Sequence, residues 1–225
     1  MTEGFRIKKA WPRVCGSDVR RAQLLPVSNI SDVMFRRFGA PAGLRARHRG
    51  GQLSGPALTV SVRPGDNLML HKALVMAQPG DVIVVDAGGA LDNAIMGELM
   101  LARGVQAGIA GIVIWGAIRD AGSIAQQDVP VFASGVSHRG PYKDGPGEIG
   151  FPIALGNMLV NPGDLIVGDE DGILAIPHEQ ASEILARAEK KHTAEDQQLQ
   201  TTLQGEYDAT WVDDALIRLG CEFTS

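Results

Sequence analysis

The sequence places an arginine and an aspartate side by side, Arg119 and Asp120, shortly after the apolar run "GIAGIVIW" at 108–115. An arginine guanidinium can hold an oxygen anion with two parallel hydrogen bonds. An aspartate can bind Mg²⁺, which keeps several waters and takes further oxygen ligands from the substrate, so that one or two carboxylates suffice. The residues alone also allow a plainer interpretation, an exposed ion pair at the end of a strand that adds little stability.

A second candidate loop covers residues 86–97, "DAGGALDNAIMG", and leads into a predicted helix. Amides at the start of a helix have no partner within it, so they can bind a carboxylate or phosphate. Gly97 allows a ligand to approach the amides around Glu98, Leu99 and Met100 closely. A cation, an arginine and these amides together suit a 2-oxo acid. The carboxylate and keto oxygens of such an acid can chelate the cation, and the arginine can stabilise an enolate.

Three consecutive elements position these two loops. "DVIVVD" at 81–86 and "GIVIW" at 111–115 are short apolar runs typical of buried strands, and "AIMGELMLARGVQAG" at 94–108 indicates a helix. A strand, a helix and a strand in this order predict a right-handed crossover between parallel strands. Ligands in open α/β sheets bind at the carboxyl ends of the strands, so we expect both loops to form one site there.

The rest of the chain predicts a mixed α/β protein with many short strands. Residues 17–38 indicate a helical region interrupted near Pro26, with Ser28 or Ser31 as a cap. The other expected elements are a strand at 57–62, a helix at 66–77, strands at 129–133, 151–155, 158–161, 165–169 and 172–177, and a helix from His178 to about Leu203.

Charge and composition limit the kinds of partner. The 225-residue chain has a formal net charge of −5 at pH 7, so it has no excess of basic residues that would favour binding to nucleic acid. Its two cysteines, Cys15 and Cys221, do not have the number or spacing of a disulfide scaffold or a zinc site. The N-terminus lacks an apolar signal region, and no stretch approaches the ~18 apolar residues of a membrane span. We therefore expect a cytoplasmic protein with no nucleic-acid partner and no membrane partner.

The order Glu98, twenty further residues, then Arg119 and Asp120 resembles the signature of the RraA-like family. This family contains class II 4-hydroxy-4-methyl-2-oxoglutarate / 4-carboxy-4-hydroxy-2-oxoadipate aldolases and regulators of ribonuclease E activity. The segments "PGDVIVVDAGG" at 79–89 and "GPGEIGFPIALGNMLVNPGDLIVGDEDGILAIP" at 145–177 are similar to the family as well. The resemblance thus extends over most of the chain.

The resemblance implies an α/β fold of the swivelling β/β/α kind, with a mixed core sheet and flanking helices. It also implies a single domain over 1–225 that assembles as a homotrimer or, from two trimers, a homohexamer. The polar C-terminal helix and the apolar residues Trp211, Leu216 and Ile217 fit an oligomer, so we expect the C-terminal helix and tail, about 178–225, in subunit contacts.

The resemblance also implies roles for the residues of the signature. Asp120 is expected to bind a divalent metal, Mg²⁺ or Mn²⁺, and Arg119 to contact the oxygens of pyruvate. The amides of the turn Gly97, Glu98, Leu99 and Met100 are expected to hold the pyruvate carboxylate, and Glu98 to order waters for proton transfer.

One position departs from the aldolase pattern. Ser123 stands where that pattern has a second acidic residue. A serine can hydrogen-bond a metal-bound water, but it brings no charge to the site.

The activity implied is that of a metal-dependent aldolase, a carbon–carbon lyase. It would cleave a 4-hydroxy-2-oxo acid of the 4-hydroxy-4-methyl-2-oxoglutarate or 4-carboxy-4-hydroxy-2-oxoadipate type to pyruvate and a second oxo acid. Oxaloacetate decarboxylation passes through the same pyruvate enolate and is expected as a side activity. Two alternatives stay open: a protein that is primarily an oxaloacetate decarboxylase, and a non-catalytic regulatory binding protein.

Several other polar residues allow both a functional and a structural interpretation. Lys72 could form an imine only if it were buried, and an exposed or paired lysine is the preferred interpretation. His71 could be a general base, but it is better explained as a residue that packs its helix or that supports the residues of the site from outside. The loop of His138 could shape the pocket or a subunit contact. Asp86 and Asp92 are expected to accept hydrogen bonds from loop amides.

Overall fold

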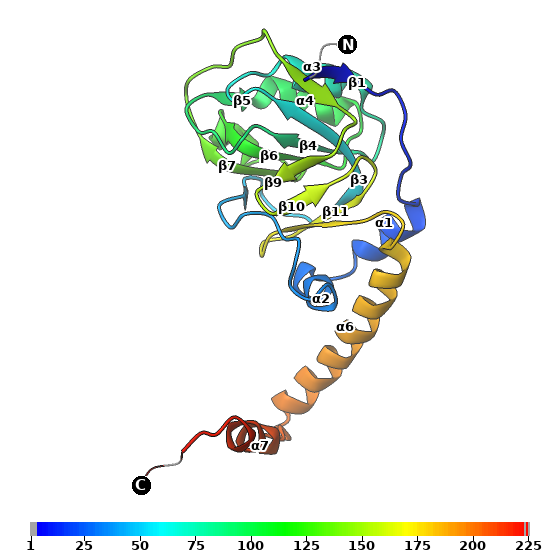
Figure 1. The fold of residues 1–225 in the computed structure, drawn as a ribbon, viewed down its shortest axis with the longest axis vertical. Helices are drawn as coiled ribbons and strands as arrows, with labels where there is room; N and C mark the ends of the chain where they lie inside the picture. Colours follow the sequence, from blue (N-terminus) through cyan, green and yellow to red (C-terminus); the bar gives the residue numbers. More distant parts are fainter. Residues whose placement is uncertain (1–3, 223, 225) are drawn as a thin grey trace. The chain divides into compact units, whose positions relative to one another are not determined.

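The structure is a computed structural model that describes residues 4–222 and 224 (Figure 1). The chain divides into two compact units, one up to Ala188 and one from Glu189 onward. The helices are α1 (Gly16–Ala22), α2 (Val27–Val33), α3 (Leu68–Met76), α4 (Glu98–Gln106), α5 (Ala121–Ile124), α6 (Ala181–Leu203) and α7 (Thr210–Arg218). The strands are β1 (Phe5–Ile7), β2 (Arg45–Ala46), β3 (Leu53–Val62), β4 (Val82–Asp86), β5 (Ala94–Met96), β6 (Gly111–Ile118), β7 (Val131–Val136), β8 (Gly147–Ile149), β9 (Ile153–Leu155), β10 (Met158–Val160), β11 (Leu165–Gly168) and β12 (Ile173–Ile176).

A mixed sheet forms the centre of the first unit. Its main strand order is β1–β8–β3–β4–β6–β7–β2, and its four central strands, β3, β4, β6 and β7, run parallel to one another. The connection from β4 through α4 to β6 therefore joins parallel neighbours, as the sequence predicts. The antiparallel strands β2 and β8 pair with β7 and β3 respectively. The expected mixed core sheet with flanking helices is confirmed.

The central strands bury side chains on both faces, which explains their continuous apolar runs. In β4, Ile83 and Val85 belong to the core that also contains α3 and α4, whereas Val82 and Val84 belong to the core shared with β9 and β10. All four side chains are fully buried. Because successive side chains of a strand point to opposite faces of the sheet, this one strand contributes to two separate cores.

The long strand β3 takes part in two pairings. Residues 53–56 pair antiparallel with β11, and residues 57–61 pair parallel with β4. The hairpin of β11 and β12 has its own apolar core with α1, α2 and the start of α6. The α6 residues in that core are Ala181, Ile184, Leu185 and Ala188.

The segment expected as one helix at 94–108 is a short strand followed by a helix. Residues 94–96 form β5, which pairs with the end of β6 through Ala94 with Ala117 and Met96 with Ile118. The helix begins only after Gly97, whose backbone is extended. The prediction of a helix from residue 94 is wrong at this end, because β6 runs three residues beyond the predicted 115 and offers β5 a neighbour.

The N-terminal helical region is interrupted at the predicted proline. Pro26 is the N-cap of α2, so Ser28 and Ser31 lie inside the helix and the expectation of a serine cap is wrong. Proline is favoured at the start of a helix because its φ is already suitable and it has no N–H to pair. Strands β1, β2 and β8 were not expected either, because their two or three residues are too few for a recognisable period.

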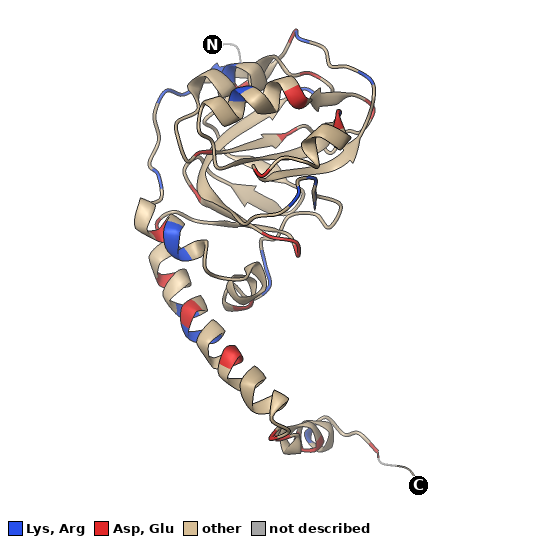
Figure 2. Cartoon of the chain, turned by 180° about the vertical axis from the view of Figure 1, so that it is seen from behind, with Lys and Arg blue, Asp and Glu red and all other residues tan. Residues whose placement is uncertain are grey.

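The second unit contains the later part of α6 and α7. Its α6 residues carry opposite charges one turn apart, including the ion pair of Lys191 with Glu195 at 2.5 Å, and Figure 2 shows acidic and basic residues along this helix. The α7 side chains of Trp211 and Ile217 are 60% and 65% exposed. Among the described residues, no helix is both long and apolar enough to cross a membrane.

Candidate functional site

The carboxyl end of β6 carries the predicted arginine and aspartate. The amide of Arg119 donates to the carbonyl of Met96 at 2.9 Å, which joins this end of β6 to β5. Asp120 has φ +56°, a left-handed conformation that is uncommon for a residue other than glycine. The turn brings its carboxylate to the start of α4, where Oδ2 accepts a hydrogen bond from the amide of Glu98 at 3.0 Å. The two predicted loops therefore meet.

Gly97 makes this close approach possible. A Cβ atom at this position would collide with Oδ2 of Asp120 and would lie 3.0 Å from Cγ of Arg119. The requirement is for space rather than for an unusual φ, because the backbone of Gly97 is extended. Any larger residue would push the Arg119–Asp120 pair away from the helix.

The amides of the Gly97–Met100 turn are not equally available. The Glu98 amide is already paired with Asp120, and the Met100 amide donates to the carbonyl of Gly97 at 3.1 Å. The amide of Leu99 lies in the first helical turn, whose N–H groups find no partner inside a helix. Among the amides of Glu98, Leu99 and Met100, that of Leu99 is therefore the best placed to bind a carboxylate.

These elements border a cavity of about 300 Å³. Five predicted site residues line it: Gly97, Leu99, Met100, Arg119 and Asp120. The other lining residues are Asn67, His71, Ala94, Ile95, Met96, Arg103, Gly140, Pro141 and Lys143. The side chain of Glu98, for which we expected a role in ordering waters, is exposed and does not line the cavity; that role stays a prediction.

The cavity is rich in positive charge. Arg103 and Lys143 line it together with Arg119, while Asp120 is its sole carboxylate among the described residues. His71 lies beside Arg103, with Nδ1 and the guanidinium nitrogen 3.5 Å apart. Burial and the nearby charges of Arg103 and Lys143 lower the pKa of His71 below its usual 6.5. At neutral pH the uncharged form of the imidazole is therefore favoured.

Neither Arg103 nor Lys143 was expected at the site from the sequence. Arg103 lies four residues after Leu99 on α4, a spacing that places both side chains on the same face of the helix and could have revealed it. Lys143 belongs to the loop after β7 and no local pattern connects it with α4.

Asn67 adds an unpaired acceptor to the cavity. Its side chain is 3% exposed, and its Nδ2 donates to the carbonyl of Ile95 at 3.0 Å. Its Oδ1 has no hydrogen-bond partner among the described residues. Buried polar atoms normally have a partner, so this oxygen can accept a hydrogen bond from a ligand or a water.

The donor set for a cation is small. The described residues contain no group of three or more His, Cys, Asp or Glu side chains that could hold a metal ion. Asp120 uses Oδ2 for the Glu98 amide, and its Oδ1 accepts no hydrogen bond from the described residues. One free carboxylate oxygen in an open site fits Mg²⁺ or Mn²⁺, which take most of their ligands from water and substrate. Ser123 lies in α5 and does not line the cavity.

The remaining predicted residues lie outside the cavity, apart from His71. Lys72 is exposed, as expected. Asp86 accepts a hydrogen bond from the amide of Gly88 at 2.9 Å, which confirms its role in the loop; burial nevertheless raises its pKa. The side chain of Asp92 is exposed, and its carbonyl accepts a hydrogen bond from Ser137. His138 lines a separate hollow of about 320 Å³ that also includes Arg119 and Asp120.

Comparison with known proteins gives the same family by sequence and by fold. The RraA-like family model, described as Aldolase/RraA, matches residues 27–175. A protein of Halalkalibacterium halodurans named "Putative 4-hydroxy-4-methyl-2-oxoglutarate aldolase" is 39% identical over 173 residues, covering 77% of this chain and 82% of that protein.

Two solved structures named as RraA proteins are similar in fold. RraAS2 of Streptomyces coelicolor, an unusual member of the RNase ES inhibitor RraA protein family, has a TM-score of 0.76 and 30% identity, covering 83% of this chain and 98% of its own. The RNA-processing inhibitor RraA of Thermus thermophilis has a TM-score of 0.63 and 28% identity, covering 68% of this chain and 92% of its own. The sequence signature, the fold and these matches agree, and the chain belongs to the RraA-like family.

Proposed function

We propose that this protein is a divalent-metal-dependent aldolase that cleaves a 4-hydroxy-2-oxo acid to pyruvate and a second oxo acid. The observation that carries the proposal is the bond from the Glu98 amide to Asp120, which places a carboxylate, an arginine and a helix start at the rim of one cationic cavity. The 39% identity to a protein named as an aldolase supports the same reaction class.

The residues of the chain would bind the pyruvyl end of the substrate. Asp120 would hold Mg²⁺ or Mn²⁺, and the cation, when bound, supplies polarisation of the 2-oxo group. The amide of Leu99 is placed to donate a hydrogen bond to the C1 carboxylate. Arg119 would hold the oxygen on which negative charge develops, with donors fixed before the reaction begins.

The reaction needs the proton of the C4 hydroxyl to leave. As it leaves, C4 becomes a carbonyl, the C3–C4 bond breaks, and its electron pair forms the enolate of pyruvate. Arg119 stabilises the enolate oxygen, and protonation at C3 gives pyruvate. Oxaloacetate reaches the same enolate by losing CO₂ from C4, so the same site would decarboxylate it.

The charge of the cavity supports an acid with a second carboxylate. Arg103 and Lys143 line the same cavity as Arg119. The negative charges of Asp120 and of a substrate with a single carboxylate would not balance these positive charges together with that of the metal ion. Both 4-hydroxy-4-methyl-2-oxoglutarate and oxaloacetate carry a second carboxylate. We propose these dianions, rather than simple 2-oxo acids, as the substrate class.

The test is a screen of 2-oxo acids for pyruvate release, with and without Mg²⁺ or Mn²⁺. We expect release from a 4-hydroxy-2-oxo diacid, loss of release after chelation, and recovery when either cation is added. Lys143 is exposed, whereas an imine-forming lysine needs a desolvated site. Borohydride trapping of pyruvate on a lysine, or full activity in the presence of chelator, would disprove the metal-dependent mechanism.

A regulatory binding protein is the second candidate, supported by the two similar structures that are named as RraA inhibitors. For such a protein the surface rather than the cavity carries the function. The same screen separates the two candidates, since a regulator releases no pyruvate from any 2-oxo acid with either cation.

We also propose a homotrimer or homohexamer. The apolar α7 side chains Trp211 and Ile217, and Leu219 just after them, are exposed in the single chain and would be covered in subunit contacts. Sedimentation velocity of the full chain measures the assembly, and a monomer at micromolar concentration would contradict it.

A further inference from the structure

The loop between β7 and β8, residues 137–146, brings Lys143 to the cavity. In the part of the chain that the structure describes, the ammonium group of Lys143 makes no hydrogen bond or ion pair. A lysine with several rotatable bonds can serve as a carboxylate-binding group only if its backbone is held in place. The contacts that hold this loop therefore decide where Lys143 can act.

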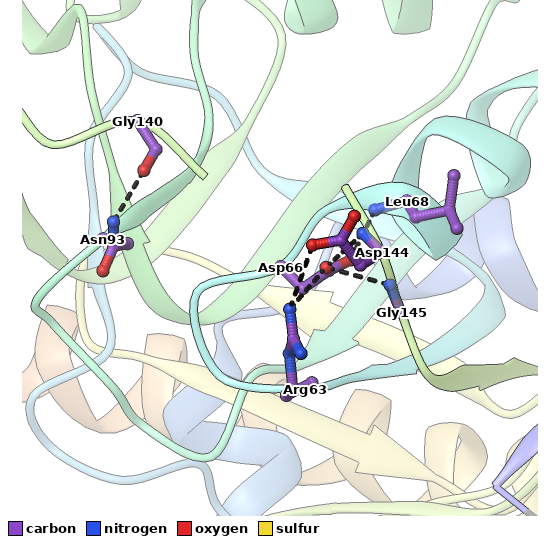
Figure 3. A network of polar contacts seen from close by, with 7 residues as sticks. All are labelled: Arg63, Asp66, Leu68, Asn93, Gly140, Asp144 and Gly145. Atoms are coloured by element: carbon purple, nitrogen blue, oxygen red, sulfur yellow. Dashed lines mark hydrogen bonds and ion pairs between the residues drawn. The ribbon is translucent and has the colours of Figure 1, made fainter. Parts of the chain in front are cut away.

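A single buried carboxylate, that of Asp66, holds the loop immediately after Lys143. Its Oδ2 accepts hydrogen bonds from the amides of Asp144 at 2.7 Å and Gly145 at 2.9 Å. Its Oδ1 accepts a hydrogen bond from the amide of Leu68 at 2.9 Å, at the first residue of α3. The Asp66 side chain is fully buried, and Figure 3 shows these donors converging on it.

The ionised form of this carboxylate is favoured. Burial alone would raise the pKa of Asp66, but the amides of Leu68, Asp144 and Gly145 and the nearby charge of Arg63 together lower it. Nη2 of Arg63 lies 3.2 Å from Oδ2 of Asp66. A carboxylate that is ionised and accepts three amides ties the loop to the start of α3 with charge-assisted hydrogen bonds.

The other side of the loop is also anchored. Nδ2 of Asn93 donates to the carbonyl of Gly140 at 2.6 Å, and the amide of Ala94 donates to the carbonyl of Arg139 at 2.9 Å. These contacts fix the loop before Lys143, whereas Asp66 fixes it after Lys143. Asp66 does not line the cavity itself, so its influence on a ligand must pass through the loop.

We propose that Asp66 is a positioning residue that holds Lys143 where it binds the second carboxylate of the substrate. This inference rests on the proposed function, because it takes a dianionic 2-oxo acid as the ligand. It assigns to Asp66 a selectivity between dianions and monoanions, which a purely structural role would not produce.

The test measures binding rather than turnover, so its outcome is separate from that of the aldolase screen. The probes are 2-oxoglutarate and 2-oxopentanoate, which have the same chain length but differ in the second carboxylate. Calorimetry on the Mg²⁺-loaded full chain gives both Kd values for the native protein, Asp66→Asn, Lys143→Gln and the double variant.

Asparagine replaces one acceptor oxygen of Asp66 with a donor, so at least one buried amide loses its partner. We expect Asp66→Asn and Lys143→Gln each to raise the Kd of 2-oxoglutarate about tenfold, the scale of a lost charge contact, and to leave 2-oxopentanoate within about twofold. The double variant should match Lys143→Gln, because both changes remove the same contact.

Asp164→Asn is the matched control. Asp164 is 2% exposed and also accepts backbone hydrogen bonds, from Asn161 at 2.8 Å and His178 at 3.1 Å, but it does not line this cavity. It should change neither Kd. Equal weakening of both probes by Asp66→Asn, unchanged 2-oxoglutarate binding, or additive effects in the double variant would overturn the proposal.

Arg63→Gln decides the question if Asp66→Asn does not fold. Nη2 of Arg63 lies 3.2 Å from Oδ2 of Asp66 and 3.8 Å from Oδ2 of Asp144, so this variant weakens the same anchor of the loop while Asp66 itself is kept. A selective increase in the Kd of 2-oxoglutarate supports the proposal, and unchanged binding of both probes overturns it.

Discussion

The carboxylate of Asp120 accepts a hydrogen bond from the amide of Glu98, and the two residues are 22 positions apart in the sequence. The bond connects the end of β6 with the start of α4, where a negative charge is favourable for the helix. It uses one carboxylate oxygen and leaves the other without a hydrogen bond from the described residues. This single contact makes one site of two loops and underlies the first three predictions.

Asp120→Asn should weaken the binding of Mg²⁺ or Mn²⁺. Asparagine can still accept the hydrogen bond from the Glu98 amide, so the fold should be kept while the charge is lost. In the native protein, oxalate should tighten cation binding, and the cation should tighten oxalate binding by the same factor. Calorimetry with and without oxalate measures both. Unchanged cation affinity in Asp120→Asn would exclude Asp120 as the ligand, and Asp128→Asn, at an exposed ion pair with Arg49, is the control.

Arg119→Lys should lower kcat for pyruvate release. Lysine keeps the charge but loses the fork of donors, and loss of an oxyanion donor costs about 10²–10³ in rate, or about 3–4 kcal/mol. Thermal unfolding should be almost unchanged, because the Arg119 side chain is 45% exposed. Arg49→Lys, at a side chain 63% exposed and outside the cavity, should leave kcat unchanged. Full oxaloacetate decarboxylation by Arg119→Lys would remove Arg119 from the mechanism.

Gly97→Ala should damage both the site and the stability. The added methyl group collides with Oδ2 of Asp120, so the Arg119–Asp120 pair must move; overpacking of this kind costs about 1–3 kcal/mol. We expect a loss of cation affinity together with a lower unfolding midpoint. Gly122→Ala in α5 meets no atom within 4 Å and should keep both. A fully active Gly97→Ala protein would show that the close approach is dispensable.

His71 should titrate below its usual pKa of 6.5, because burial and the charges of Arg103 and Lys143 disfavour its protonated form. The unfolded chain then binds more protons than the folded one at pH values below about 6.5. The contribution of His71 to the free energy of unfolding is therefore lost as the pH falls from 6.5 through the folded pKa. Chemical denaturation of the native protein and His71→Asn between pH 5 and pH 7.5 should show the native protein losing more stability on acidification.

The same lowered pKa can be followed directly by NMR. A dianion bound in the cavity should raise the pKa of His71, since negative charge favours the imidazolium. Saturating 2-oxoglutarate is the probe, and 2-oxopentanoate should have a smaller effect. A pKa above 6.5 without ligand would contradict the electrostatic description of the cavity.

Much of the site followed from local pattern. The apolar runs at 81–86 and 111–115 and the helical pattern between them predict parallel strands joined by a crossover, and parallel strands end at the same edge of a sheet. Arg119, Asp120 and the Gly97–Met100 turn were therefore expected together before any tertiary contact was known. The structure confirms that arrangement through the contacts of Arg119 with Met96 and of Asp120 with Glu98.

Other parts depended on contacts that no local pattern encodes. Residues 94–96 have a helical pattern of apolar residues, yet they form β5 because the extended end of β6 supplies hydrogen bonds that a helix there would give up. Propensity is a weak preference and tertiary pairing overrides it. The same reason explains why the start of the helix was predicted too early.

The sequence by itself determined the family, the crossover unit and the pairing of an arginine with an aspartate at the end of a strand, because residue types and short spacings encode them. The tertiary structure alone decided that Lys143 joins Arg103 in the cavity and that Asp66 holds the loop that brings it there. Asp66 and Asp144 are 78 positions apart, and the position of such a pair is set by the packing of whole elements. Long-range contacts of this kind form only when the chain is compact, so residue spacing carries no record of them.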